Sequence, residues 1–181
     1  MNEEDLMSLK LSTYISEEEI QKKVKELGEA LTKKYKGQSV VAVCVLKGSF
    51  LFFSDLIRHI DLDVQCEFFG VSSYHGGMTS SGEVKVTLDL ASPIEGKNVI
   101  LVEDIVDTGL TMNYLKSNLS SRKPKSLTTV TLLEKPEALK VPCELDHVGF
   151  KIPSDFVVGY GLDYQGLYRN LPYIAQVQSL N

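Results

Sequence analysis

A run of seven apolar residues, VVAVCVL at positions 40–46, constrains the fold more than any other feature of this sequence. A strand with one solvent-facing side alternates apolar and polar residues, whereas this run is apolar throughout and rich in β-branched valine. A second segment, NVILVE at positions 98–103, has the same character over its four central residues. Both runs therefore predict strands that are buried on two faces of a parallel sheet, and such a sheet requires helices on each side.

Helical and strand patterns alternate along the rest of the chain. Ser16 followed by Glu19 forms a capping-box pattern, and apolar residues then recur at helical spacing until about Gly37. Further helices are predicted at residues 49–60 and 109–119, and further strands at residues 64–72, 83–88, 126–133, 147–152 and 156–158. Turn signals and aromatic residues become frequent after residue 141. The sequence thus predicts an α/β fold, with a mostly parallel central sheet flanked by helices and a small C-terminal or hood lobe, in a single domain over residues 1–181.

Composition excludes several classes of function. Lysine and arginine total 19 against 24 acidic residues, so the formal charge of −5 argues against a nucleic acid partner. No apolar run approaches the roughly 20 residues that span a bilayer, and the acidic start MNEEDLMSLK is unlike a secretory leader, so we expect no membrane association and a cytoplasmic protein. The cysteines at positions 44, 66 and 143 lack CxxC spacing, which predicts buried free thiols in a reducing compartment.

Residues 98–111, NVILVEDIVDTGLT, carry the most chemistry. Two acids, Glu103 and Asp104, come at the carboxyl end of a buried strand, where open α/β sheets place their ligands. The following turn contains Thr108, Gly109, Leu110 and Thr111 and opens a helix, an arrangement that presents backbone N–H groups and hydroxyls to a phosphate. Acids beside a phosphate require cations or hydroxyl groups, which a sugar phosphate with Mg²⁺ supplies. The segment predicts a ribose 5-phosphate pocket, with a plain metal site or a solvated acidic loop as the alternatives.

The segment VILVEDIVDTGLT also resembles the signature with which type I phosphoribosyltransferases bind phosphoribosyl pyrophosphate (PRPP). The resemblance extends from about residue 15 to residue 174 and is strongest to the bacterial type of hypoxanthine-guanine phosphoribosyltransferases. It implies a purine-salvage transferase that moves the 5-phosphoribosyl group of PRPP to hypoxanthine or guanine with Mg²⁺, giving IMP or GMP plus pyrophosphate. It also implies a homodimer or homotetramer.

The resemblance assigns further residues of the binding site. Lys47 and Gly48 match the pyrophosphate loop, in which a non-proline cis peptide precedes the lysine. Arg169 matches an arginine that helps to hold pyrophosphate. Ser73 and Tyr74 match the loop that closes over the reacting centre. The purine site is matched by Lys135, which would bond the 6-oxo group, by the stacking residue Phe156, and by Val157 and Asp163.

The same resemblance implies the catalytic roles. Asp107 matches the general base that takes a proton from the purine nitrogen. Glu103 and Asp104 would contact the ribose hydroxyls and one Mg²⁺, and Asp163 would bind a second Mg²⁺. From the residues alone other roles stay open, because Asp107 is also placed to cap a helix, Lys135 to lie in a surface turn and Phe156 to pack in the core.

Three rival functions are compatible with parts of the sequence. A regulator on the same fold, including an RNA-binding attenuation protein, is disfavoured by the matches at Asp107, Lys135, Asp163 and Arg169 and by the acidic composition. A different 6-oxopurine preference, with xanthine accepted, is not excluded. A receiver-like acidic module would explain Glu103 and Asp104 but leaves the phosphate turn without a role.

Overall fold

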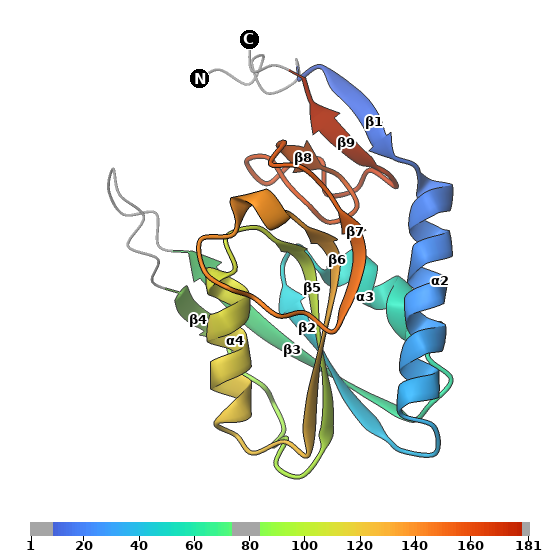
Figure 1. The fold of residues 1–181 in the computed structure, drawn as a ribbon, viewed down its shortest axis with the longest axis vertical. Coiled ribbons are helices and arrows are strands. Elements are labelled where there is room, and N and C mark those ends of the chain that lie inside the picture. Colours follow the sequence, from blue (N-terminus) through green and yellow to red (C-terminus); the bar gives the residue numbers. More distant parts are fainter. Residues whose placement is uncertain (1–8, 74–83, 179–181) are drawn as a thin grey trace.

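The computed structural model describes residues 9–73 and 84–178 and is built around a six-stranded sheet (Figure 1). Its strand order is β4-β3-β2-β5-β6-β7, in which β3 and β4 are antiparallel and the other neighbours are parallel. The strands are β2 (Val40–Leu46), β3 (Val64–Ser73), β4 (Val84–Leu88), β5 (Asn98–Val106), β6 (Ser126–Glu134) and β7 (His147–Lys151). The two apolar runs form β2 and β5, which pair with each other at the centre of the sheet, as their burial pattern predicts.

Helices cover both faces of this sheet. Helix α2 (Glu17–Lys34) and helix α3 (Phe50–Ile57) share one core with Val40, Ala42 and Cys44 of β2. Helix α4 (Leu110–Ser120) lies on the opposite face, where the intervening residues of β2 point. A short 3-10 helix, η1 (Pro136–Ala138), follows β6. The predicted α/β layering is therefore confirmed, and within the described residues no helix is both long and apolar enough to cross a membrane.

A small lobe, called the hood here, lies beyond the carboxyl ends of the central strands (Figure 1). It contains a three-stranded antiparallel sheet of β1 (Leu11–Ile15), β9 (Ile174–Val177) and β8 (Val157–Val158), in that order. The predicted C-terminal lobe is present, but its sheet also takes in a strand from the beginning of the chain. Neither β1 nor β9 was predicted, because each is short and becomes a strand only through its pairing with the other.

Several local predictions differ from the structure. The strand predicted at 98–103 continues to Val106, and the helix predicted at 49–60 spans Phe50–Ile57. Cys44 is buried as expected, but Cys66 is exposed and Cys143 only partly buried. Cys66 lies on a part of β3 that has no pairing with β4. Ser73 ends β3, whereas Tyr74, the other residue of the predicted lid, falls outside the described residues.

Candidate active site

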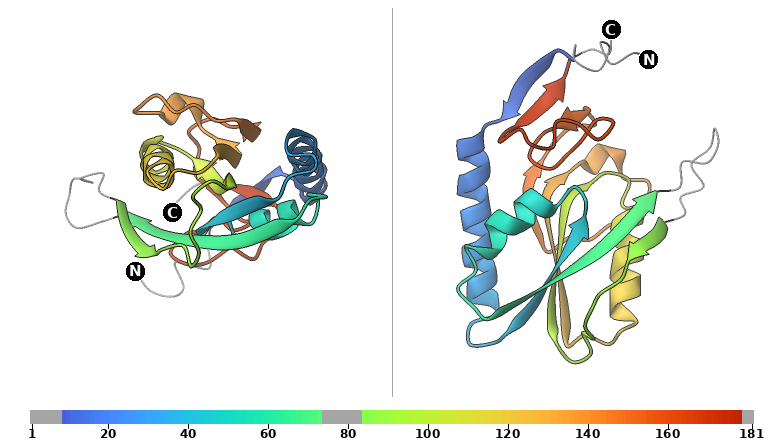
Figure 2. Two further views of the ribbon diagram at one scale, coloured as in Figure 1. Left: turned by 90° about the horizontal axis from the view of Figure 1, so that it is seen from below. Right: turned by 180° about the vertical axis from the view of Figure 1, so that it is seen from behind.

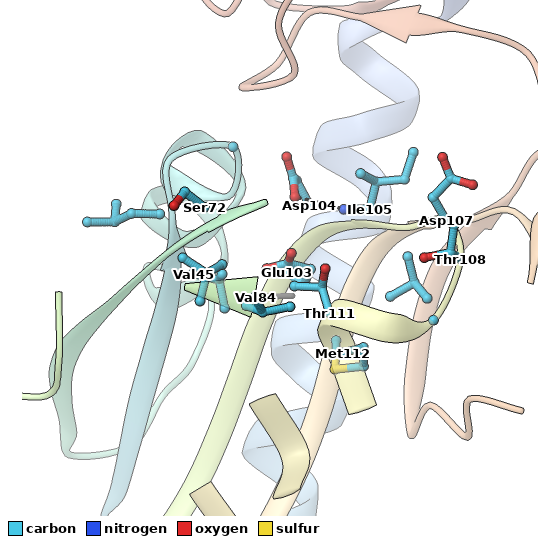
Figure 3. A pocket seen from close by; sticks show the side chains of 15 residues that line it. Val45, Ser72, Val84, Glu103, Asp104, Ile105, Asp107, Thr108, Thr111 and Met112 are labelled. Carbon is cyan, nitrogen blue, oxygen red and sulfur yellow. Dashed lines mark hydrogen bonds between the residues drawn. The ribbon is translucent and has the colours of Figure 1, made fainter. Parts of the chain in front are cut away.

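A cavity of about 460 Å³ opens at the carboxyl ends of β2 and β5 (Figure 3). Its walls come from β2, β3, β4, β5 and the turn that opens α4. They include seven residues predicted from the sequence, namely Gly48, Glu103, Asp104, Asp107, Thr108, Gly109 and Thr111. Strand order explains the position, since the helices after β2 and β5 leave on opposite faces and the strand ends between them form a crevice.

The loop after β2 forms one wall of this cavity. The peptide between Leu46 and Lys47 is cis, as the resemblance predicted. A Cβ atom on Gly48 would stand 1.6 Å from Oδ2 of Asp104, so only glycine permits this approach between the loop and the acidic strand end. The side chain of Lys47 is exposed and does not line the cavity.

Glu103 and Asp104 both line the cavity, and Glu103 is buried. Burial raises the pKa of Glu103 well above its ordinary range, and the charge of Asp104 adds to the rise while a hydrogen bond from Ser49 opposes it. Burial also raises the pKa of Asp104, to about 6, against the backbone N–H of Ile105 and the charge of Arg169. Two adjacent carboxyls are thus held where ionisation of both is costly, so the pair suits a cation or hydroxyl donors.

Ser49 is a site residue that the sequence reasoning did not single out. Its hydroxyl is fully buried, donates to Oε2 of Glu103 at 3.3 Å and accepts the backbone N–H of Asp104 at 3.0 Å. The hydroxyl therefore joins the loop after β2 to both acids. Its position directly after Lys47 and Gly48, at a strand end, was the available signal.

The turn between β5 and α4 has the geometry of a phosphate cradle. Gly109 has φ +80°, and a Cβ there would meet the carbonyl oxygen of Val141 at 3.0 Å. Thr108 and Thr111 line the cavity, whereas Leu110 is exposed and does not. Gly109 rather than Asp107 is the N-cap of α4, so the alternative role of Asp107 as its N-cap is wrong. The hydroxyl of Thr108 accepts the N–H of Leu110, the first residue of the helix, at 3.4 Å.

Asp107 lines the cavity and pairs with Lys135, which lies outside the lining. The Lys135 ammonium lies 3.6 Å from Oδ2 of Asp107, and the side chain of Lys135 is 8% exposed against 51% for Asp107. The lysine is therefore buried rather than part of a surface turn. Figure 3 shows the carboxylates of Asp104 and Asp107 both directed toward the hood, drawn at the top.

The remaining predicted residues lie in the hood. Arg169 pairs with Oδ1 of Asp163 at 2.6 Å and donates to the carbonyl oxygen of Gly161 at 2.5 Å. Phe156 is 50% exposed and stands edge-on to Tyr164, with ring centroids 5.8 Å apart, so it is not a core residue. Val157 is buried and pairs with Gln176 of β9, so its side chain is not available to a ligand.

The acids predicted as metal ligands are not gathered into one cluster. Among residues 9–73 and 84–178, no three histidine, cysteine, aspartate or glutamate side chains converge as a metal site. Glu103 and Asp104 are adjacent, while Asp163 is bound to Arg169 and to the N–H of Gly166. A hard cation at Glu103 and Asp104 would need oxygen ligands from water or substrate, which is the usual mode for Mg²⁺ beside phosphates.

Comparisons with known proteins agree with this site. The family of the phosphoribosyl transferase domain matches residues 12–165. The chain is 53% identical to a hypoxanthine-guanine phosphoribosyltransferase of Staphylococcus aureus (strain Mu50 / ATCC 700699), covering 91% of this chain and 92% of that protein. It is also 53% identical to the protein of that name from Bacillus subtilis (strain 168), with 89% of each chain covered.

Solved structures give the same result. A hypoxanthine-guanine phosphoribosyltransferase of Bacillus anthracis superposes with a TM-score of 0.88 at 49% identity, over 94% of this chain and 99% of the other. A hypoxanthine phosphoribosyltransferase of Staphylococcus aureus superposes with a TM-score of 0.89 at 51% identity, over 98% of this chain and 96% of the other. These likenesses confirm the resemblance seen in the sequence and the predicted fold. With its phosphate turn, its acidic pair and its matched relatives, the chain belongs to the phosphoribosyltransferase family and is an enzyme of that family.

Proposed function

We propose that this protein transfers the 5-phosphoribosyl group of PRPP to hypoxanthine or guanine, giving IMP or GMP and pyrophosphate. The observation that carries the proposal is the single cavity in which a phosphate turn, an acidic pair and a glycine loop face one another. PRPP has a phosphate, two ribose hydroxyls and a diphosphate in that order. The three walls of the cavity match those three groups in chemistry. Relatives named for hypoxanthine and guanine support the choice of base.

The turn at Thr108, Gly109, Leu110 and Thr111 would hold the 5-phosphate. Backbone N–H groups at the start of α4 and two threonine hydroxyls favour an anion there, and the positive φ of Gly109 opens the backbone toward it. Leu110 would contribute its backbone, since its side chain faces solvent. The substrate would then lie along β5 with its ribose toward the acids.

Glu103 and Asp104 would accept hydrogen bonds from the ribose hydroxyls and bind Mg²⁺. Their raised pKa values, caused first by burial, fit carboxyls that wait for a cation. Mg²⁺ supplies charge neutralisation of the leaving pyrophosphate when it is bound. Asp163 is the proposed ligand of a second Mg²⁺, and it would exchange its contact with Arg169 for the ion.

Lys47, Gly48 and Arg169 would bind the pyrophosphate. The glycine lets the backbone of the loop approach Asp104 closely, and the exposed lysine is long enough to reach anionic oxygens outside the cavity. Arginine adds a planar fork of donors for phosphate oxygens. Bond breaking at the anomeric carbon leaves negative charge on this group, so these cations would stabilise the transition state.

The purine would lie between the cavity and the hood. The exposed ring of Phe156 is available for stacking, the buried ammonium of Lys135 for the 6-oxo group, and the backbone of Val157 for the base edge. Asp107, at 3.6 Å from Lys135, would take the proton that the purine nitrogen loses as it attacks the sugar. A hydrogen-bond donor of the protein opposite the purine 6-position favours oxopurines, because the amino group of adenine could not accept its hydrogen bond.

Ser73 and Tyr74 remain the predicted lid, and a cytoplasmic location remains an expectation. We also propose that the protein forms a homodimer or homotetramer. Phe50 and Phe68 are 40% and 44% exposed, and large apolar side chains on a surface favour association. A monomer mass in light scattering at micromolar concentration would contradict this.

The test of function is nucleotide formation from purified protein, PRPP and Mg²⁺, with hypoxanthine, guanine, xanthine and adenine offered separately. We expect IMP and GMP to form and adenine to stay unreacted. A reaction with Mg²⁺ removed by a chelator is the control for metal dependence. If PRPP binds but none of the four bases reacts, the chain is a regulator on this fold rather than a transferase.

A further inference from the structure

Tyr160 is a buried hood residue that has no role in the site described so far. It is 4% exposed and has φ +47°, a backbone conformation that residues other than glycine seldom adopt. Its hydroxyl donates to Oδ2 of Asp55 at 2.6 Å. This bond crosses from the hood to helix α3, which Figure 2 shows beneath the hood loops. It therefore links two parts of the chain that are 105 residues apart.

The acceptor is itself held in place. Oδ2 of Asp55 also accepts a hydrogen bond from Nε2 of Gln21, in α2, at 2.9 Å. The carboxylate of α3 is therefore bonded both to α2 and to the hood. Burial, together with the bond to Asp55, raises the pKa of the Tyr160 phenol, so the hydroxyl stays protonated and keeps donating. A distance of 2.6 Å is typical of a hydroxyl bonded to an ionised carboxylate, which is stronger than a bond between neutral groups.

The residues on either side of this bond belong to the pyrophosphate half of the site. Helix α3 begins directly after Gly48 and Ser49. Gly161, next to Tyr160, lies so close to this loop that a Cβ on it would stand 2.0 Å from the carbonyl oxygen of Gly48. Gly161 also exchanges two hydrogen bonds with Arg169, one from its N–H to the arginine carbonyl at 2.9 Å and one from the guanidinium to its own carbonyl.

These contacts form one continuous path. Asp55 holds Tyr160, Tyr160 orients Gly161, and Gly161 touches the pyrophosphate loop while it holds Arg169. The part of the hood next to Phe156 has a further support of its own, because Val157 and Val158 pair with β9. A loosened Tyr160 would thus disturb the pyrophosphate half of the site more than the purine half.

We propose that Tyr160 is a positioning residue, whose hydrogen bond to Asp55 sets the hood segment at Gly161 and Arg169 against the pyrophosphate loop so that both contact the leaving group together. This inference rests on the proposed function for the identity of the ligand. Tyr160 itself would touch neither substrate, since its hydroxyl points to α3.

The test compares Tyr160→Phe with a matched control, Tyr35→Phe. Tyr35 is equally buried, at 3% exposed, and its hydroxyl bonds the hydroxyls of Thr128 at 2.7 Å and Ser126 at 3.2 Å, away from the cavity. Because each change removes one buried hydroxyl, a purely structural role predicts a loss of thermal stability in both variants and unchanged kinetics in both. A positioning role predicts that Tyr160→Phe alone raises the KM for PRPP and the Kd for pyrophosphate with Mg²⁺, by roughly tenfold, while the KM for hypoxanthine changes little.

Asp55 supplies the second arm. Asp55→Ala should reproduce the kinetic effect of Tyr160→Phe, and the double variant should be no worse than Asp55→Ala, since both remove the same bond. Asp55→Asn keeps an acceptor oxygen and should restore most of the pyrophosphate affinity. Unchanged kinetics in Tyr160→Phe, or additive effects in the double variant, would overturn the proposal.

The outcomes also separate this proposal from the proposed function. A wild-type protein that binds pyrophosphate but forms no nucleotide would refute the transferase assignment, and calorimetry of pyrophosphate with the same variants would still decide the role of Tyr160. A wild-type protein that binds neither PRPP nor pyrophosphate would overturn both.

Discussion

Replacing Asp104 by asparagine should stabilise the ligand-free protein and abolish its activity. Asp104 lies against Gly48 and beside the buried Glu103, and burial raises its pKa to about 6 from an ordinary value of 3.8. The Asn side chain has nearly the same shape, and its oxygen can still accept the N–H of Ile105, which Oδ1 of Asp104 now accepts at 2.9 Å. The substitution therefore removes the charge and leaves the packing.

The magnitude follows from the linkage between pKa and folding. A carboxyl whose pKa is higher in the folded than in the unfolded state stabilises the fold while it is protonated, at low pH. The unfolded chain loses its proton first as pH rises past about 4, so the wild type is destabilised from there through the folded pKa near 6. A rise of this size corresponds to at most about 3 kcal/mol at neutral pH. Relief of the repulsion on Glu103 acts in the same direction.

The assay is urea unfolding of both proteins with a chelator present, at pH values between 4.5 and 8. The variant should gain stability over the wild type progressively across this range and keep the gain above pH 7. Asp61→Asn, an exposed carboxylate outside the cavity, controls for the amide substitution itself. A difference that is constant with pH, or that grows toward low pH, would refute the assignment of a raised pKa to Asp104.

Three further substitutions test the proposed roles. Ser49→Ala leaves the buried N–H of Asp104 without an acceptor, so the free energy of unfolding measured in urea should fall by about 1–3 kcal/mol, and the KM for PRPP should rise. Unaltered stability would contradict the role of the Ser49 hydroxyl in joining the loop after β2 to the acids. Asp107→Asn should lower kcat by about 10²- to 10⁴-fold with little change in PRPP affinity, and equal losses in both would count against a general base. Lys135→Met should lower kcat/KM for hypoxanthine and guanine by roughly 10- to 100-fold, so that the preference of the enzyme for these bases over adenine becomes smaller. An unchanged preference among the bases would contradict a role of Lys135 in purine recognition.

Most of the central fold could be predicted because its signals are local. The uniform apolar runs determine β2 and β5 without reference to any distant residue. The capping box is likewise complete within four residues, with Ser16 and Glu19 each bonding the other's backbone N–H. The hood sheet could not be predicted in this way. Its register pairs Leu11 with Val177, and nothing near either residue encodes that partner.

The same distinction applies to the site. The residues of the acidic strand end and phosphate turn are contiguous in sequence, so one motif predicted them together. Ser49 was missed because its partners lie 54 and 55 residues away, across the sheet. Phe156 and Lys135 show the reverse case. Composition favours a buried phenylalanine and an exposed lysine, whereas the structure exposes the first and buries the second.

The exposure of Phe156 and the burial of Lys135 fit a site in which bound substrates would provide the missing partners of these side chains. A buried ammonium at Lys135 faces a mainly exposed acid, and two buried carboxyls at Glu103 and Asp104 have raised pKa values, so both ends of the cavity carry groups that the protein alone neutralises poorly. Under the proposed function, a 6-oxopurine would supply an acceptor for the lysine, and a hydroxylated sugar with a cation would supply donors and charge for the acids. The two groups of residues would then bind different halves of the reacting pair. The same charged groups that lower the stability of the ligand-free protein would then orient both substrates. Enzyme sites commonly show this trade-off between stability and activity.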